Sequence, residues 1–449
     1  MSSSTGEVAA TSLDPAFIAR RRRAITSAWA GFAIDSYSIY VASTSLLPAM
    51  VYFQAHLSAS QLSVFVGMTF AATLLGRPIG ALLFGHFADR IGRRRVGSIT
   101  IYGFGTISLF IAMLPGAEQV GAGAATALLL GLRFIEGIFL GGEYTAATPL
   151  ALEYASRGRR GFTGALIQCS ASGGPFVVAV LTSLVLVFAP NAGLHSPYVQ
   201  WGWRIPFVIG AFLAWFVAWF LRRRVEDSDT WKETTRSKSP LRDMLKGSSG
   251  RAFLQSYIIM TGVFFAVNML GSVMPQLLLS NKGYTAADLA HTQLINAWPG
   301  IATYLFFGWL SDRIGRKRAL YIAATITIVF TPITYTLMAN GSVHGWANLT
   351  LLAASTNVVT LGALGVLPAY INERFATAVR SSGWGVAYST AVVIPAFFSY
   401  YQLGLAHLVP AAFTPGILAA FGGVLILFAV MAGPETRGSD LHTVGEAGS

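Results

Sequence analysis

The sequence predicts an all-α membrane protein in which twelve transmembrane helices form two six-helix bundles. Three observations support this fold class. Hydrophobic residues make up 54% of the 449 residues and charged residues only 11%, whereas soluble domains average about 25% charged residues. Long apolar runs alternate with short polar loops, and one glycine-rich loop pattern occurs twice. The composition therefore argues against a water-soluble globular protein.

The expected spans are long apolar runs bounded by charged residues or by Pro and Gly. In the first half they fall at 24–50, 61–87, 96–114, 124–152, 162–188 and 205–221. In the second half they fall at 252–279, 290–310, 319–338, 347–371, 382–406 and 412–432. The first run is too long for a cleavable signal peptide. We therefore expect a tail at 1–23, a bundle at 24–221, a linker at 222–251, a second bundle at 252–433 and a tail at 434–449.

The positions of the basic residues indicate the orientation. If the amino terminus is cytoplasmic, 27 of the 31 Lys and Arg residues fall in cytoplasmic tails and loops. This asymmetry follows the positive-inside rule, so we expect both termini to be cytoplasmic. The net charge of +12 then reflects topology, and we expect no nucleic-acid partner. The single cysteine, Cys169, excludes a disulfide framework within the chain. We expect no metal and no cofactor.

A charged loop pattern recurs in the two halves. The first copy reads Gly85-x-x-x-Asp89-Arg90-x-Gly92-Arg93, and the second, 223 residues later, reads Gly308-x-x-x-Asp312-Arg313-x-Gly315-Arg316. A second pattern, Glu153 with Arg160, recurs 220 residues later as Glu373 with Arg380. Glycine permits tight turns, and an Asp can cap a helix or accept from an arginine. We expect these residues to form a cytoplasmic gate between the bundles; alternatively, the arginines are only positive-inside determinants.

Several motifs resemble those of a known family. They are the repeated loop, Gly76-Arg77-Pro78-Ile79-Gly80, Arg133-Phe134-Ile135-Glu136-Gly137, Gly141-Gly142-Glu143-Tyr144 and Pro434-Glu435-Thr436-Arg437-Gly438. The chain resembles the major facilitator superfamily and, within it, the metabolite:proton symporter group. The resemblance implies secondary transport of a small polar metabolite, commonly an organic acid or zwitterion, with protons. We expect a monomer in the cell inner membrane. Its partners would be substrate, protons and membrane lipid.

Five charged residues lie inside the expected spans: Asp35, Arg77, Arg133, Glu136 and Glu143. Such a residue is costly in lipid, so it should face the protein interior and have a partner or a task. We expect Asp35, Glu143 or Glu136 to carry the coupling proton. Arg77 and Arg133 would hold a substrate carboxylate. Alternatively, Arg133 pairs permanently with Glu136 or Asp35 and only holds helices together.

Neutral polar residues supply further candidates for substrate contact, because the second-half spans have no charged residue away from their cytoplasmic ends. In an apolar span such side chains also serve as contacts between helices. The candidates are Tyr37, Tyr40, Asn268, Gln276, Asn296, Asn357 and Tyr388.

Other functions remain open at this point. A proton-coupled exporter of a drug-like or natural product would use the same fold, and a membrane sensor without transport is a further alternative. We do not expect an enzyme, because the sequence has no Walker loop, no H-E-x-x-H helix and no G-x-S-x-G elbow.

Overall fold

The computed structural model describes residues 14–54, 59–229, 231, 239–281, 284 and 286–441. Most of the expected N-terminal tail, part of the expected linker and the last residues of the C-terminal tail lie outside this set. Within it, the chain follows the predicted order of helices.

The first half contains six helical rods. They are α2 (Pro15–Val41) with η1 (Ala42–Leu46) and η2 (Leu47–Tyr52), α3 (Ala59–Ile91), α4 (Arg93–Ala112), α6 (Ala122–Glu153), α7 (Arg160–Cys169) with η4 (Ser170–Ser172) and α8 (Gly173–Phe188), and η5 (Tyr198–Gly202) with α9 (Arg204–Arg224). A short helix, α5 (Ala117–Val120), links α4 to α6.

The second half repeats the arrangement. Its rods are α12 (Gly247–Asn268) with η6 (Met269–Val273) and α13 (Met274–Leu279), α14 (Ala286–Ile314), α15 (Arg316–Ala339), α16 (Trp346–Asn372), α17 (Arg380–Thr390) with α18 (Val393–Ala396) and α19 (Phe398–Leu405), and η8 (Ala411–Phe413) with α20 (Thr414–Met431). The short helix α11 (Pro240–Met244) precedes them.

Nine helices in the described ranges are long and apolar enough to cross a membrane. The other three rods are α2, which begins among four arginines, α14, which carries polar residues in its first turns, and the interrupted α17–α19. The expected spans at 24–50, 290–310 and 382–406 correspond to these three rods. Asp14 caps α2 by accepting from the Ala16 amide at 3.0 Å, so the helix begins at Pro15 rather than at residue 24.

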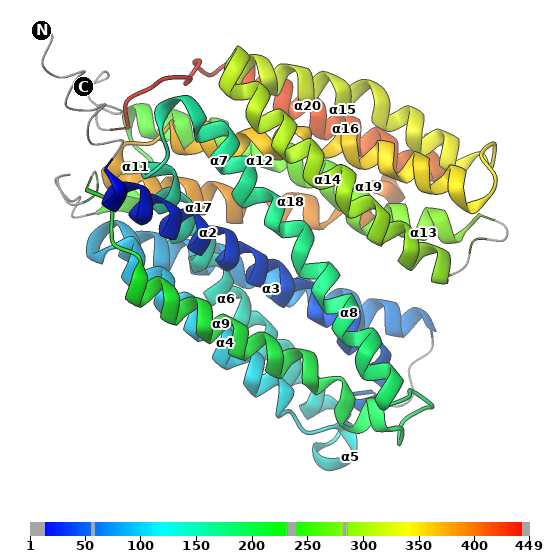
Figure 1. The fold of residues 1–449 in the computed structure, drawn as a ribbon. Helices are drawn as coiled ribbons and strands as arrows, with labels where there is room; N and C mark the ends of the chain where they lie inside the picture. Colours follow the sequence, from blue (N-terminus) through cyan, green and yellow to red (C-terminus); the bar gives the residue numbers. More distant parts are fainter. Residues whose placement is uncertain are drawn as a thin grey trace, which may run out of the picture.

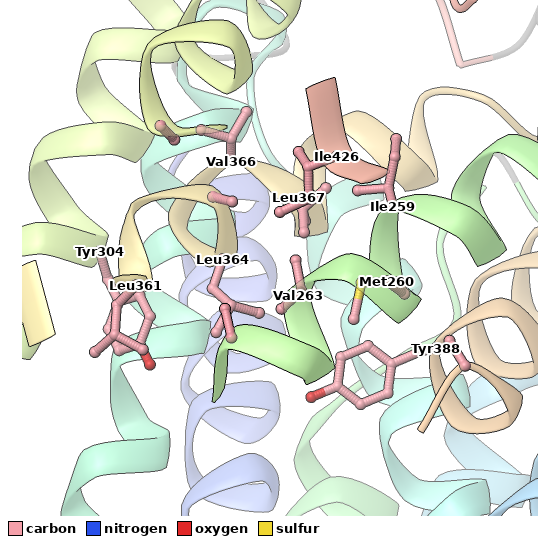
Figure 2. Close-up of a cluster of buried hydrophobic side chains, with 14 of the residues drawn as sticks. Ile259, Met260, Val263, Tyr304, Leu361, Leu364, Val366, Leu367, Tyr388 and Ile426 are labelled. Atoms are coloured by element: carbon pink, nitrogen blue, oxygen red, sulfur yellow. The ribbon is translucent and has the colours of Figure 1, made fainter. Parts of the chain in front are cut away.

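The two halves meet near the described ends of the chain and diverge toward the opposite end (Figure 1). We call the first of these ends the motif end, because it carries residues 85–94 and 308–317. Across it, α3 packs on α17 and α7 packs on α14. Inside the second half, apolar side chains of α12, α16 and α20 form a core, including Val263, Leu364 and Ile426 (Figure 2).

Glycines bring α3 and α6 into direct backbone contact. A Cβ on Gly80 would lie 1.8 Å from the Ile138 carbonyl oxygen, and one on Gly141 would lie 2.2 Å from that of Arg77. Small residues allow such close packing within a membrane. The contact places the Arg77 backbone against Gly141, two residues before Glu143.

Candidate functional site

The first of two charge clusters at the motif end joins α3 to α17 of the other half. The Asp89 carboxylate accepts from the amides of Ser381 and Ser382 at 3.1 and 2.8 Å and from the Ser382 hydroxyl at 2.8 Å. These amides belong to the first turn of α17, where a helix favours an anion. A single aspartate thus ties the two halves together.

Glu153 completes this first cluster. Its carboxylate forms ion pairs with Arg93 of the same half and Arg380 of the other half, and the Ser228 hydroxyl donates to it. The side chains of Glu153, Arg93 and Arg380 are all 0% exposed. Since a buried carboxylate needs charged partners, the pair of arginines accounts for its position.

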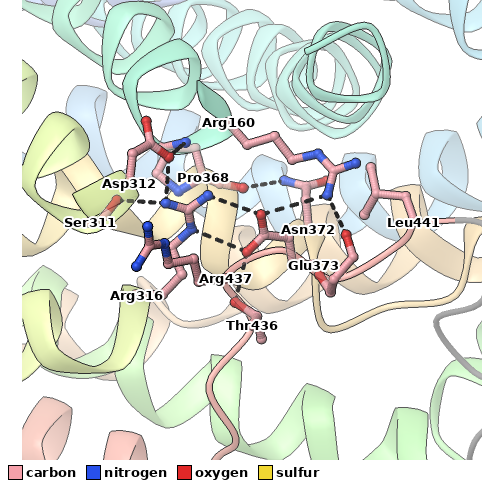
Figure 3. Close-up of polar contacts among 12 residues, drawn as sticks. Arg160, Ser311, Asp312, Arg316, Pro368, Asn372, Glu373, Thr436, Arg437 and Leu441 are labelled. Atoms are coloured by element: carbon pink, nitrogen blue, oxygen red, sulfur yellow. Dashed lines mark hydrogen bonds and ion pairs between the residues drawn. The ribbon is translucent and has the colours of Figure 1, made fainter. Parts of the chain in front are cut away.

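The second cluster repeats this design with the halves exchanged (Figure 3). Asp312 of α14 accepts from the amides of Gly161 and Phe162, at the start of α7, at 2.9 and 2.8 Å. Arg316 donates two hydrogen bonds of 3.2 Å to Glu373 and one of 2.6 Å to Asp312. Arg160 of the first half lies 3.9 Å from Glu373.

The motif glycines serve both turns and contacts. Gly92 and Gly315 have φ values of 107° and 104°, which suit glycine at the sharp turns before α4 and α15. A Cβ on Gly85 would lie 3.1 Å from the Ser382 Cα, and one on Gly308 would lie 2.3 Å from the Ala165 Cβ. These two glycines therefore permit the close approach of the halves.

Two predicted gate residues lie outside the clusters. Arg90 lies 3.2 Å from the His86 ring nitrogen, and Arg313 lies over the Trp309 ring at 4.9 Å. Both arginines are exposed. Helical periodicity gives the reason, because each follows its aspartate by one residue and so points about 100° away from it.

Sequence reasoning missed a third repeat, which follows the last helix of each half. Asp227 accepts from the Arg94 amide at 2.9 Å, as Glu435 accepts from the Arg316 amide at 2.8 Å. The next residue then donates to the cluster glutamate: Ser228 to Glu153, and Thr436 to Glu373 at 2.7 Å. The available signal in the sequence was an acidic residue followed directly by Ser or Thr, a pair that recurs 208 residues later.

Within the first half, Asp35 of α2 and Arg77 of α3 form a buried ion pair. The Arg77 Nη2 atom lies 3.0 Å from Asp35 Oδ2, and the Arg77 and Asp35 side chains are 7% and 1% exposed. The other carboxylate oxygen, Oδ1, has no hydrogen-bond partner among the described residues.

Glu143 of α6 lies beside the same helix. A Cβ on Gly31, one turn before Asp35, would lie 2.3 Å from Glu143 Oε1, so this glycine makes room for the carboxyl group. Both oxygens of Glu143 are buried and without a hydrogen-bond partner among the described residues. The structure thus brings Asp35 and Glu143, which we expected to carry the proton, and Arg77, which we expected to bind substrate, to the same part of α2.

Arg133 and Glu136 form a separate pair on α6. The Arg133 Nη1 atom lies 2.5 Å from Glu136 Oε2 and also donates to the Ser38 carbonyl oxygen of α2 at 3.1 Å. Both residues are fully buried. Arg133 therefore pairs with Glu136 rather than with Asp35, the other partner considered from the sequence. Its hydrogen bond to Ser38 links α6 to α2.

The neutral candidates are dispersed. Tyr37 donates to the Pro206 carbonyl oxygen at 2.6 Å, Asn268 donates to that of Pro395 at 3.0 Å, and Asn357 donates to that of Ala353 at 3.2 Å. These three side chains contact neighbouring backbone. Gln276 and Tyr40 are exposed. Asn296 is buried, and neither amide atom of its side chain has a partner among the described residues.

Tyr388 belongs to an aromatic cluster that the sequence did not predict. Its ring centroid lies 4.4 Å from that of Tyr144 and 5.6 Å from that of Trp384, while Phe32 stacks on Tyr144 at 4.5 Å. Tyr144 follows Glu143 in the chain and donates to Gln168 at 2.8 Å. Aromatic rings of both halves therefore meet directly beside the buried acid.

Comparisons with known proteins agree with this architecture. The family model of the Major Facilitator Superfamily matches residues 29–372. The chain is 30% identical to the alpha-ketoglutarate permease of Escherichia coli (strain K12), with 92% of each chain covered. It is 26% identical to the shikimate transporter of the same organism, covering 85% of this chain and 87% of the relative.

Solved structures share the fold. The proton:xylose symporter XylE superimposes with a TM-score of 0.75 at 18% identity, covering 95% of this chain and 99% of that one. FucP in its outward conformation gives a TM-score of 0.67 at 16% identity, covering 90% and 98%. The predicted fold class and family resemblance are confirmed. The chain belongs to the Major Facilitator Superfamily of membrane transporters.

Proposed function

We propose that this chain is a proton-coupled symporter that imports a small organic acid or zwitterion by alternating access. The observation that carries the proposal is the buried Asp35–Arg77 pair beside Glu143, an acid with no hydrogen-bond partner among the described residues. Relatives named for alpha-ketoglutarate, shikimate and proline or betaine support a carboxylate-bearing substrate.

The coupling follows from competition for one arginine. A substrate carboxylate that binds Arg77 displaces Asp35 from it. An unpaired carboxylate inside the membrane costs several kcal/mol, so Asp35 takes up a proton as it leaves. Glu143 is protonated for the same reason, since no cation pairs with it. Anion binding and proton binding thereby become one event.

The motif end faces the cytoplasm in this proposal, with both termini on that side of the inner membrane. The two charge clusters hold the cytoplasmic side closed, and substrate enters from the opposite side. Release then requires both clusters to separate as one half rocks against the other. Return of the empty carrier restores the Asp35–Arg77 pair.

Uptake into proteoliposomes tests the proposal. With an inward proton gradient, alpha-ketoglutarate, shikimate, proline and betaine are supplied outside, and we expect one of these compounds, or a related carboxylate, to accumulate. A proton ionophore should abolish that accumulation. A compound that accumulates only under the reversed gradient would instead identify the exporter alternative.

A further inference from the structure

A groove at the motif end lies beside the second charge cluster. Its volume is about 400 Å³, and it opens beside the first turns of α15, next to the segment that follows α20. Lys317, Arg318 and Arg437 line it together with Tyr321 and Glu435. Three cations thus face one carboxylate.

In the described ranges, this carboxylate forms no ion pair with the three cationic side chains, so the groove keeps a net positive charge. Glu435 accepts from the backbone amides of Arg316 and Lys317 at 2.8 and 3.0 Å and from that of Arg437 at 2.9 Å. The Lys317 ammonium donates to the carbonyl oxygens of Met431 and Gly433. In the described part of the chain, the Arg318 and Arg437 guanidinium groups have no carboxylate partner. The groove therefore suits an anion.

The pseudo-equivalent position in the first half is less basic and has a tryptophan ring beside it. A Cβ on Gly92 would lie 2.7 Å from Asp227 Oδ2 and 3.5 Å from the Trp231 ring, so these groups fill the space beside α4. For Gly315 the three nearest atoms all belong to Glu435. The offset of 208 also places Asp229 where the second half has Arg437. These differences favour anion binding in the second half over the first.

An apolar track leads away from the groove along α15. Ile322, Val329 and Ile333 are 41%, 48% and 49% exposed. At 100° per residue they lie within about 60° of Arg318 on the helix surface. This helix is one of the nine candidate membrane spans. A ligand with a phosphate at the groove and a hydrocarbon chain would match both features.

We propose that the groove binds the headgroup of an anionic phospholipid, whose acyl chain lies along the exposed face of α15. The cations contact the phosphate, as basic pockets at membrane faces do. Tyr321 lies beside Lys317, with its ring centroid 5.9 Å from the ammonium, and its amphipathic ring suits the headgroup level.

The test compares Arg318 with its counterpart Arg95, 223 residues earlier. The full chain is placed in phosphatidylcholine nanodiscs with increasing phosphatidylglycerol, and native mass spectrometry measures the bound phosphatidylglycerol. Because one basic residue near a membrane contributes about 1 kcal/mol, Arg318→Gln should weaken the apparent affinity about fivefold and Arg318→Gln/Arg437→Gln about 30-fold. Arg95→Gln should leave it unchanged.

Three results would overturn the proposal. Equal losses of phosphatidylglycerol affinity for Arg95→Gln and Arg318→Gln would indicate only general attraction to the basic surface. Unchanged phosphatidylglycerol binding by Arg318→Gln/Arg437→Gln would show that the lipid does not bind in the groove. A soluble probe, glycerol 3-phosphate, separates lipid from free phosphate: if it protects the protein against heating as well as phosphatidylglycerol does, the ligand is not a lipid. Melting temperatures in phosphatidylcholine alone check folding, and the single variant suffices if the double variant is unstable.

Discussion

The two halves of the molecule are alike at the motif end and different inside the membrane. At the motif end, Asp89 and Glu153 have direct counterparts in Asp312 and Glu373, with equivalent partners in the opposite half. Inside the membrane, the same offsets of 223 and 220 make Gly300 the counterpart of Arg77 and Ala363 the counterpart of Glu143. The charge cluster at the motif end is duplicated, whereas the buried charges of the first half are not.

This difference separates two requirements of a transporter. Closing one side needs contacts from both halves, so a pair of exchanged clusters suits the pseudo-symmetry. A charge inside the membrane is costly, so confining two ion pairs and one further acid to a single half limits that cost. The second half contributes neutral groups to the same region, among them Trp384 and Tyr388 against Tyr144.

The largest expected effect comes from Asp35, the acid paired with Arg77. Asp35→Asn leaves a neutral amide beside Arg77, so transport no longer releases a proton from this position. Uptake driven by a pH gradient should stop, while exchange of labelled for unlabelled substrate continues. Asn357→Ala in the second half is the matched control and should keep its pH dependence. Normal accumulation by Asp35→Asn would remove this residue from the proton pathway.

Breaking one cluster should have the next largest effect. Glu153→Gln leaves Arg93 and Arg380 without their shared carboxylate, and losing one partner of a buried pair costs about 3 to 5 kcal/mol. We expect lower thermal stability and a population opened at the motif end. Spin labels on the two halves, in a Cys169→Ser background, measure that opening. An unchanged distance distribution would show that this cluster does not hold the gate.

The sequence predicted much of this arrangement. Apolar runs located the twelve rods, and the repeated loop located both clusters, because the same residues at a fixed offset require equivalent contacts. Helix rise gives the depth of a residue but not which neighbour it faces across a helix pair. The choice of Glu136 rather than Asp35 as the partner of Arg133 therefore needed the structure. The exposure of Gln276 likewise depends on how α13 is rotated.

The repeats after α9 and α20 were missed for a different reason. Asp227-Ser228 and Glu435-Thr436 share chemistry but not residue identity, and their offset of 208 differs from 223 because the loops between them differ in length. A search for identical letters at one offset does not detect such a pair. Only the common position at the amino ends of α4 and α15 makes the equivalence clear.

A smaller effect should distinguish the two clusters. Arg380 forms a close ion pair with Glu153, whereas Arg160 lies 3.9 Å from Glu373 and donates to the Ser439 carbonyl oxygen at 2.7 Å. Arg380→Gln should therefore destabilise the protein more than Arg160→Gln, by a difference of about 1 to 3 kcal/mol. Chemical unfolding in one detergent compares them. Equal losses would mean that the clusters contribute equally despite their geometry.

The smallest effect concerns the hydroxyl groups that support the two glutamates. Ser228→Ala and Thr436→Val each remove one hydrogen bond to a buried carboxylate while the arginine pairs remain. Hydrogen bonds to charged groups contribute about 1.5 to 3 kcal/mol, and the remaining arginines should keep each loss near the lower value. Because both hydroxyls occupy the same place in their cluster, the two variants should lower the melting temperature by similar amounts. A large loss for Thr436→Val alone would show that the segment after α20 holds the gate more firmly than the segment after α9.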